Sequence, residues 1–172
     1  MQRSEYLALR RKFEPTPAAL VVVAESPPKS GKYFYNPTGE ASEPLFAALM
    51  SQLGNAPASK ENGLREFQRR GWLLVDATYE PVDGLSDKDA DAVILRDYPQ
   101  LRSDLKALLP GQLVPIILVK ANVCRLLEPL LVHDGFNVLN CGRVVYFPST
   151  GQQNAFSQQF GAILQELRYV AS

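Results

Sequence analysis

Histidine and cysteine are scarce in this chain. One histidine, His133, and two cysteines, Cys124 and Cys141, occur among its 172 residues. A two-histidine metal site and an ordinary Ser-His-Asp triad are therefore hard to assemble. The cysteines have neither metal-ligand spacing nor the density of a secreted disulfide scaffold, and each lies in an apolar context typical of a buried thiol. We expect a protein of the reducing cytoplasm that holds no metal.

An excess of charge and a long apolar run are missing as well. Eighteen basic residues balance eighteen acidic ones, so any site for a polyanion must be a local patch. No segment approaches the roughly 18 apolar residues of a membrane-spanning helix. The basic segment 1–13 has no apolar core after it, so we expect neither export nor membrane insertion. A hydrophobic content of 46% suits a single globular domain over 1–172.

Short apolar segments alternate with segments of helical pattern. Buried strands are predicted at 19–24, 72–77, 114–119 and 143–147, with a shorter apolar stretch at 136–139. Helices are predicted at 43–53 with Ser42 as the cap, 60–70, 86–96 with Ser86 as the cap, 99–109, 121–132 and 152–170. Strands that alternate with helices need crossover connections, and hence a parallel sheet. The predicted fold class is α/β, a three-layer α/β/α sandwich with a central, mainly parallel four-stranded sheet.

Polar residues follow three of the predicted strands at the point where each strand ends. They are Glu25-Ser26 after the first strand, Asp76 at the end of the second, and Pro148-Ser149 after the last. In an open parallel sheet, ligands bind outside the carboxyl ends of the strands. We therefore expect these three segments to converge on one cleft.

The same segments resemble motifs of the uracil-DNA glycosylase superfamily. Ala24-Glu25-Ser26-Pro27-Pro28 resembles the family's Gly-Glu-Ala-Pro-Gly or Gly-Gln-Asp-Pro turn, and Tyr33-Phe34-Tyr35 stands where the family has a base-stacking aromatic residue. Leu73-Leu74-Val75-Asp76 resembles the Leu-Leu-Leu-Asn strand, and Phe147-Pro148-Ser149 resembles His-Pro-Ser. Order and spacing agree over nearly the whole chain. The resemblance implies a glycosylase that flips a base out of DNA and hydrolyses its N-glycosidic bond.

The resemblance also implies roles for individual residues. Glu25 assists hydrolysis, and Asp76 reads the base or positions water. The residues expected to line the base pocket are Ala24, Ser26, Tyr33, Phe34, Tyr35, Asn36 and Phe147. The residues expected to meet DNA are Lys29, Lys32, Ser149, Thr150, Gly151, Gln152, Gln153 and Asn154, with Gln152 or Gln153 entering the duplex.

Three departures from the family pattern bear on activity. An ionised Asp76 only accepts hydrogen bonds where the family asparagine also donates, although a buried, protonated Asp76 donates to O4 of uracil. Phe147 replaces the histidine that stabilises the leaving base, so backbone N–H groups around 149–152 are the expected substitute. Ser26 stands where the Gly-Gln-Asp-Pro branch has its aspartate. The four cysteines of the iron-sulfur branch are missing, and we predict no metal and no cofactor.

Each residue role also has a plain structural alternative. Glu25 is alternatively a solvated loop residue, Asp76 a cap after its strand, the aromatic cluster 33–35 a seal over the core, and 152–154 an ordinary helix start. The stretch 26–33 has an approximate P-loop pattern but carries two prolines and lacks the first glycine, which argues against nucleotide binding.

Three functions remain open at this point. The first is a monomeric, cofactor-free DNA glycosylase that excises uracil or another deaminated base during base excision repair. The second is an inactive module that binds uracil-containing, abasic or single-stranded DNA. The third is an unrelated α/β domain that binds a nucleotide or another small molecule. The sequence does not rank the bases or the preferred DNA strand form.

Overall fold

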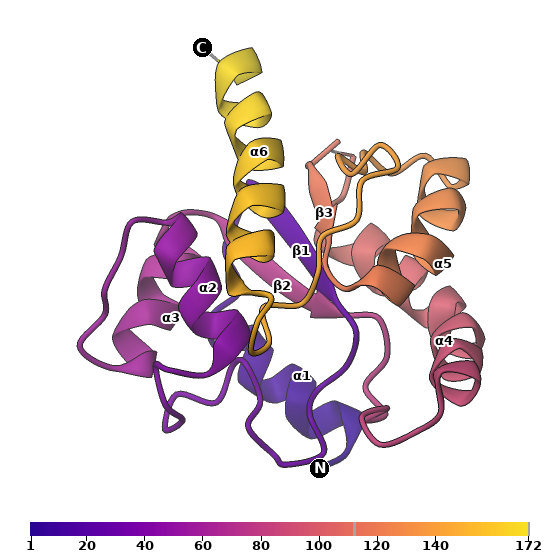
Figure 1. The fold of residues 1–172 in the computed structure, drawn as a ribbon, viewed down its shortest axis with the longest axis horizontal. Coiled ribbons are helices and arrows are strands. Elements are labelled where there is room, and N and C mark those ends of the chain that lie inside the picture. Colours follow the sequence, from indigo (N-terminus) through magenta and orange to yellow (C-terminus); the bar gives the residue numbers. More distant parts are fainter. Residues whose placement is uncertain (112, 172) are drawn as a thin grey trace.

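A parallel sheet of three strands forms the centre of the protein (Figure 1). The computed structural model describes residues 1–111 and 113–171, the last two by their backbone only. The strands are β1 (Leu20–Ala24), β2 (Trp72–Asp76) and β3 (Ile116–Leu118), in the spatial order β2-β1-β3. Every residue of these strands is buried, which explains why each strand is an almost unbroken apolar run.

Helices surround this sheet. They are α1 (Arg3–Arg11), α2 (Pro44–Gln52), α3 (Lys60–Arg69), α4 (Asp87–Leu108), α5 (Ala121–His133) and α6 (Gln153–Ala171). Helix α3 packs on β2, α5 packs on β3, and the pairs α4 with α5 and α2 with α6 are in contact. In Figure 1, α2 and α3 lie on one side of the strands, and α4 and α5 lie on the other side. No helix in the described part of the chain is both long enough and apolar enough to cross a bilayer.

The α/β class with a parallel sheet is confirmed, whereas the predicted fourth strand is wrong. Within the described ranges the sheet has three strands, and 143–147 runs extended beside β3 without joining it. A single backbone contact links it there, from Lys120 N to the carbonyl of Val145 at 2.7 Å. The apolar stretch 136–139 forms one isolated bridge, between Val138 and Ile116.

Two helix predictions also need correction. The predicted helices 86–96 and 99–109 are one helix, α4, with Pro99 inside it. The carbonyl that loses its donor there belongs to Leu95, which is 45% exposed, so water can satisfy it. Ser42 does not cap α2, because Glu43 occupies the N-cap position and the Ser42 hydroxyl donates to Glu40 instead.

The predictions for the Ser86 cap and for the two buried cysteines are confirmed in part. Ser86 caps α4 as predicted, accepting from Asp89 N at 3.1 Å. Cys124 is buried as expected, but Cys141 is exposed, because it lies in a surface turn where its φ is 49°. Helix α1 falls in the basic segment 1–13, for which the sequence suggested no element.

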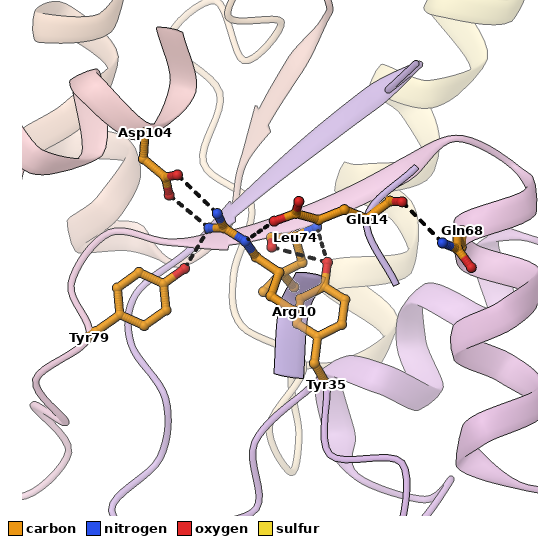
Figure 2. A network of polar contacts seen from close by, with 7 residues as sticks. All are labelled: Arg10, Glu14, Tyr35, Gln68, Leu74, Tyr79 and Asp104. Carbon is orange, nitrogen blue, oxygen red and sulfur yellow. Dashed lines mark hydrogen bonds and ion pairs between the residues drawn. The ribbon is translucent and has the colours of Figure 1, made fainter. Parts of the chain in front are cut away.

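Helix α1 is attached to the rest of the fold through Arg10, which is 3% exposed (Figure 2). Its guanidinium donates to both oxygens of Asp104 on α4 at 2.7 and 2.9 Å. It also donates to Tyr79 Oη and to Glu14 Oε1, each at 2.8 Å. This network joins α1 to α4 and to the segment that follows β2.

Candidate functional site

A cavity of about 330 Å³ lies at the carboxyl ends of β1 and β2. Seven of the residues expected at a base pocket line it: Ala24, Glu25, Ser26, Tyr33, Phe34, Asp76 and Phe147. Ala24 and Asp76 are register partners in neighbouring strands, so the end of the sheet forms one wall. Figure 1 shows the loop after β1 and the loop before α6 reaching this same end. The structure therefore brings Glu25-Ser26 and Asp76 together as expected, whereas the third segment reaches the cavity only through Phe147, since neither Pro148 nor Ser149 lines it.

Asp76, the last residue of β2, is the most unusual group of the cavity. Its side chain is 4% exposed, and its Oδ2 atom is buried with no hydrogen-bond partner among the described residues. Burial raises the pKa of Asp76 to about 7, against the opposing effect of the nearby Arg10 charge. A buried polar atom without a partner is rare in folded proteins, and it calls for an explanation such as a functional role or a bound water or ion.

Glu25, the first residue after β1, is held firmly at the cavity. Its Oε1 accepts from the ammonium of Lys120, and its Oε2 accepts from the side-chain amide of Asn122 at 2.5 Å. The side chain is 10% exposed. Both oxygens are thus occupied, so Glu25 is a fixed negative charge rather than a freely solvated loop residue.

Lys120 was not predicted, yet it lines the cavity and pairs with Glu25. It follows β3 with φ 89° and ψ 138°, a region that residues with a Cβ rarely adopt. Such strain persists only when surrounding contacts hold it, and it is often found at functional sites. Because Lys120 stands just past the third buried strand, the rule that singled out Glu25 and Asp76 applies to it equally.

Tyr33 and Phe34 line the cavity, but Tyr35 does not. The Tyr33 ring packs edge-on against Tyr6 with centroids 4.8 Å apart, and its hydroxyl is buried without a hydrogen-bond partner in the described residues. The Tyr35 hydroxyl accepts from Leu74 N at 2.7 Å and donates to Leu74 O at 3.1 Å. Tyr35 therefore does not have the role expected of it in the pocket. Its hydroxyl instead forms two hydrogen bonds with the backbone of β2.

Asn36 also lies outside the cavity lining. Its Oδ1 accepts from the Thr38 hydroxyl at 2.9 Å and from Thr38 N at 3.2 Å, which forms a local turn. The segment 33–36 thus divides: its first two residues face the cavity, and its last two stabilise the surrounding backbone.

A buried ion pair, also absent from the sequence predictions, holds the far wall of the cavity. Glu43 lines the cavity and accepts from Lys60 Nζ at 2.5 Å, and Lys60 also donates to the carbonyl of Tyr33 at 2.8 Å. Burial lowers the pKa of Lys60, while Glu43 opposes that effect. Gly39 leaves room for this pair, because a Cβ there would lie 2.5 Å from Glu43 Oε1 and the carboxylate would have to shift. Lys60 therefore fixes the backbone that carries the aromatic wall.

The residues expected to meet DNA lie on the surface around the cavity mouth. Lys29, Lys32 and all of 149–154 are exposed, and Lys32 also lines the cavity. The backbone N–H of Ser149 donates to Phe147 O, and that of Gln152 donates to Ser149 O, both at 2.8 Å. These two N–H groups are thus engaged in the turn, so the expectation that they stabilise a leaving base is wrong for them.

The described residues contain no group of three or more His, Cys, Asp or Glu side chains placed to hold a metal ion. No protein-family model matches the chain, and no curated protein matches it. The function is therefore inferred from the cavity and from the chemistry of the groups that line it.

Proposed function

We propose that the protein is a cofactor-free DNA glycosylase that excises uracil or a related deaminated base. The observation that carries the proposal is a buried, unpartnered carboxyl, Asp76, in a cavity that also presents aromatic rings and the fixed carboxylate of Glu25. The cavity volume of about 330 Å³ is within the range of small-ligand sites. A three-layer α/β/α arrangement, as in the family that the motifs resemble, is part of the same proposal.

Base binding is assigned to Asp76 and the aromatic wall. A flipped base stacks on Tyr33 or Phe34, and such stacking contributes about 1 to 3 kcal/mol per base. Its polar edge meets the free oxygen of Asp76. The exposed lysines Lys29 and Lys32 and the loop 149–154 contact the DNA backbone around the mouth of the cavity.

The bond-breaking step is assigned to opposite charges that the fold holds in place. As the N-glycosidic bond breaks, positive charge develops on the sugar and negative charge on the base. The oxygen of a water molecule then bonds to the sugar carbon, and the proton that this water loses goes to the departing base. The Glu25 carboxylate stabilises the sugar, and the Lys120 ammonium stabilises the departing base. Lys120 thus takes the part for which Phe147, which has no donor, is unsuited.

A second candidate function is a module that binds such DNA without turnover. The observation that favours it is that both Glu25 oxygens already accept a hydrogen bond, from Lys120 and from Asn122, which leaves about two of the four acceptor positions of the carboxylate for water. Binding by such a module would still use the stacking wall and Asp76.

The test is base release from labelled single-stranded and duplex oligonucleotides that contain one uracil. We expect release by the wild type and a loss of roughly 100-fold or more in Glu25→Gln, the size found when one preorganised polar group is removed. Glu61→Gln, an exposed change on α3, is the matched control and should keep full activity. Salt-dependent binding without release would select the binding module. Neither binding nor release by the wild type would refute both functions.

A further inference from the structure

The free oxygen of Asp76 lies among groups that leave it no ionic partner. On α1, the positive charge of Arg10 acts on Asp76, but the N–H groups of Arg10 donate to Asp104, Glu14 and Tyr79. Of the ion pairs between described residues, none includes Asp76. The charged side chains that share the cavity with it are Glu25, Glu43, Asp83, Lys32 and Lys120.

Asp76 also lines a smaller hollow together with Arg3, Asp97 and Asp104. Four tyrosines lie near it as well: Tyr6 on α1, Tyr33 and Tyr35 from the loop after β1, and Tyr79 after β2. Burial raises the pKa of each of them, so all four stay uncharged across the neutral range. Arg10 stays charged throughout. Among these neighbours, Asp76 is thus the group that changes its charge near pH 7.

A carboxyl group offers different hydrogen bonds in its two protonation states. The neutral acid presents one donor beside one acceptor, whereas the carboxylate presents two acceptors. The edge of uracil also has a donor beside an acceptor, N3–H and O4. The neutral acid therefore forms two bonds with that edge, while a carboxylate forms one and sets a second oxygen against O4.

We propose that Asp76 binds the base as a neutral acid, so that base recognition requires one proton held by the protein. This inference rests on the proposed function and adds its control by pH. An asparagine at the same position has a donor and an acceptor without a proton, so Asp76→Asn should bind the base equally well at all neutral pH values.

The experiment measures binding of free uracil by calorimetry, together with single-turnover base release from the uracil oligonucleotide. Both are followed from about pH 6 to about pH 8.5, where affinity of the wild type should fall roughly tenfold per pH unit once Asp76 has lost its proton. Asp76→Asn should give a flat profile and exceed the wild type at the highest pH. Asp87→Asn, an exposed change in the first turn of α4, should keep the profile of the wild type.

The possible outcomes distinguish failure of this inference from failure of the proposed function. Uracil binding or release that is independent of pH in the wild type, or that declines equally in Asp76→Asn, would overturn the inference and leave the glycosylase proposal standing. If neither the wild type nor Asp76→Asn binds or releases uracil at any pH, both the proposed function and the inference fail.

Discussion

Replacing Arg10 by methionine tests whether its buried network stabilises the fold (Figure 2). The change removes every donor that Arg10 offers to Asp104, Glu14 and Tyr79. Loss of one partner from a buried ion pair costs about 3 to 5 kcal/mol. Because the side chains of Asp104 and Glu14 are 13% and 23% exposed, water partly replaces the lost donors, and the lower end applies. We expect a loss of about 3 kcal/mol in the free energy of unfolding.

Urea and thermal unfolding followed by circular dichroism measure this loss. For a chain of this length, about 3 kcal/mol corresponds to a fall of roughly 6 to 12 °C in Tm. The matched control is Arg96→Met on α4, since Arg96 and its partner Glu80 are 56% and 52% exposed, and its second partner Asp97 is 21% exposed. An exposed pair contributes less than about 1 kcal/mol. Equal, small losses in both variants would refute the idea that burial makes the Arg10 network valuable.

Three further predictions concern the cavity and its support. Lys120→Gly should be more stable than Lys120→Ala by about 1 kcal/mol in urea unfolding, because φ 89° strains any residue with a Cβ; equal stabilities would contradict this. The pKa of Asp76, raised by burial to about 7 from its ordinary 3.8, should make the wild type less stable as pH rises from about 4 to 7, by roughly 4 kcal/mol in all. In this case the folded state holds the proton more tightly than the unfolded state, so the contribution of Asp76 to stability is greatest below about pH 4 and no longer changes above about pH 7. Parallel curves for the wild type and Asp76→Asn would refute it. Tyr35→Phe should cost about 1 to 3 kcal/mol and speed amide hydrogen exchange at Leu74, whose backbone groups lose their partner; unchanged exchange would count against that contact.

The three strands could be predicted because burial on both faces requires unbroken apolar runs. The segment 143–147 has a similar composition, but Val144 and Tyr146 are 37% and 43% exposed and only Val145 is fully buried. Alternating burial is compatible with a strand, yet a strand exists only where a neighbouring backbone offers paired donors and acceptors. That condition depends on distant parts of the chain and leaves no local pattern. The break predicted at Pro99 was wrong for a similar reason, because whether a proline ends a helix depends on whether the carbonyl that loses its donor, here that of Leu95, meets water.

The position of the site was predictable, but its contacts were not. A parallel sheet gathers the ends of its strands, so Glu25 and Asp76 had to lie close together. The same reasoning should have included Lys120, which lies two residues after the end of β3. No sequence pattern indicated the ion pair between Lys60 and Glu43, because the two residues belong to different elements, Lys60 to the start of α3 and Glu43 to the start of α2. A lysine at the start of a helix normally suggests solvent, and only the folded structure shows that it is buried.

The bond between Tyr35 and Leu74 has a consequence for association between molecules. Strand β2 is the outer strand on its side of the sheet, and an open strand edge invites pairing with another chain. The Tyr35 hydroxyl occupies both backbone groups of Leu74 at that edge and so blocks the addition of a further strand. Tyr33 and Phe34, which line the cavity, directly precede Tyr35, so a displacement of this aromatic segment that enlarged the cavity would also release the edge of β2.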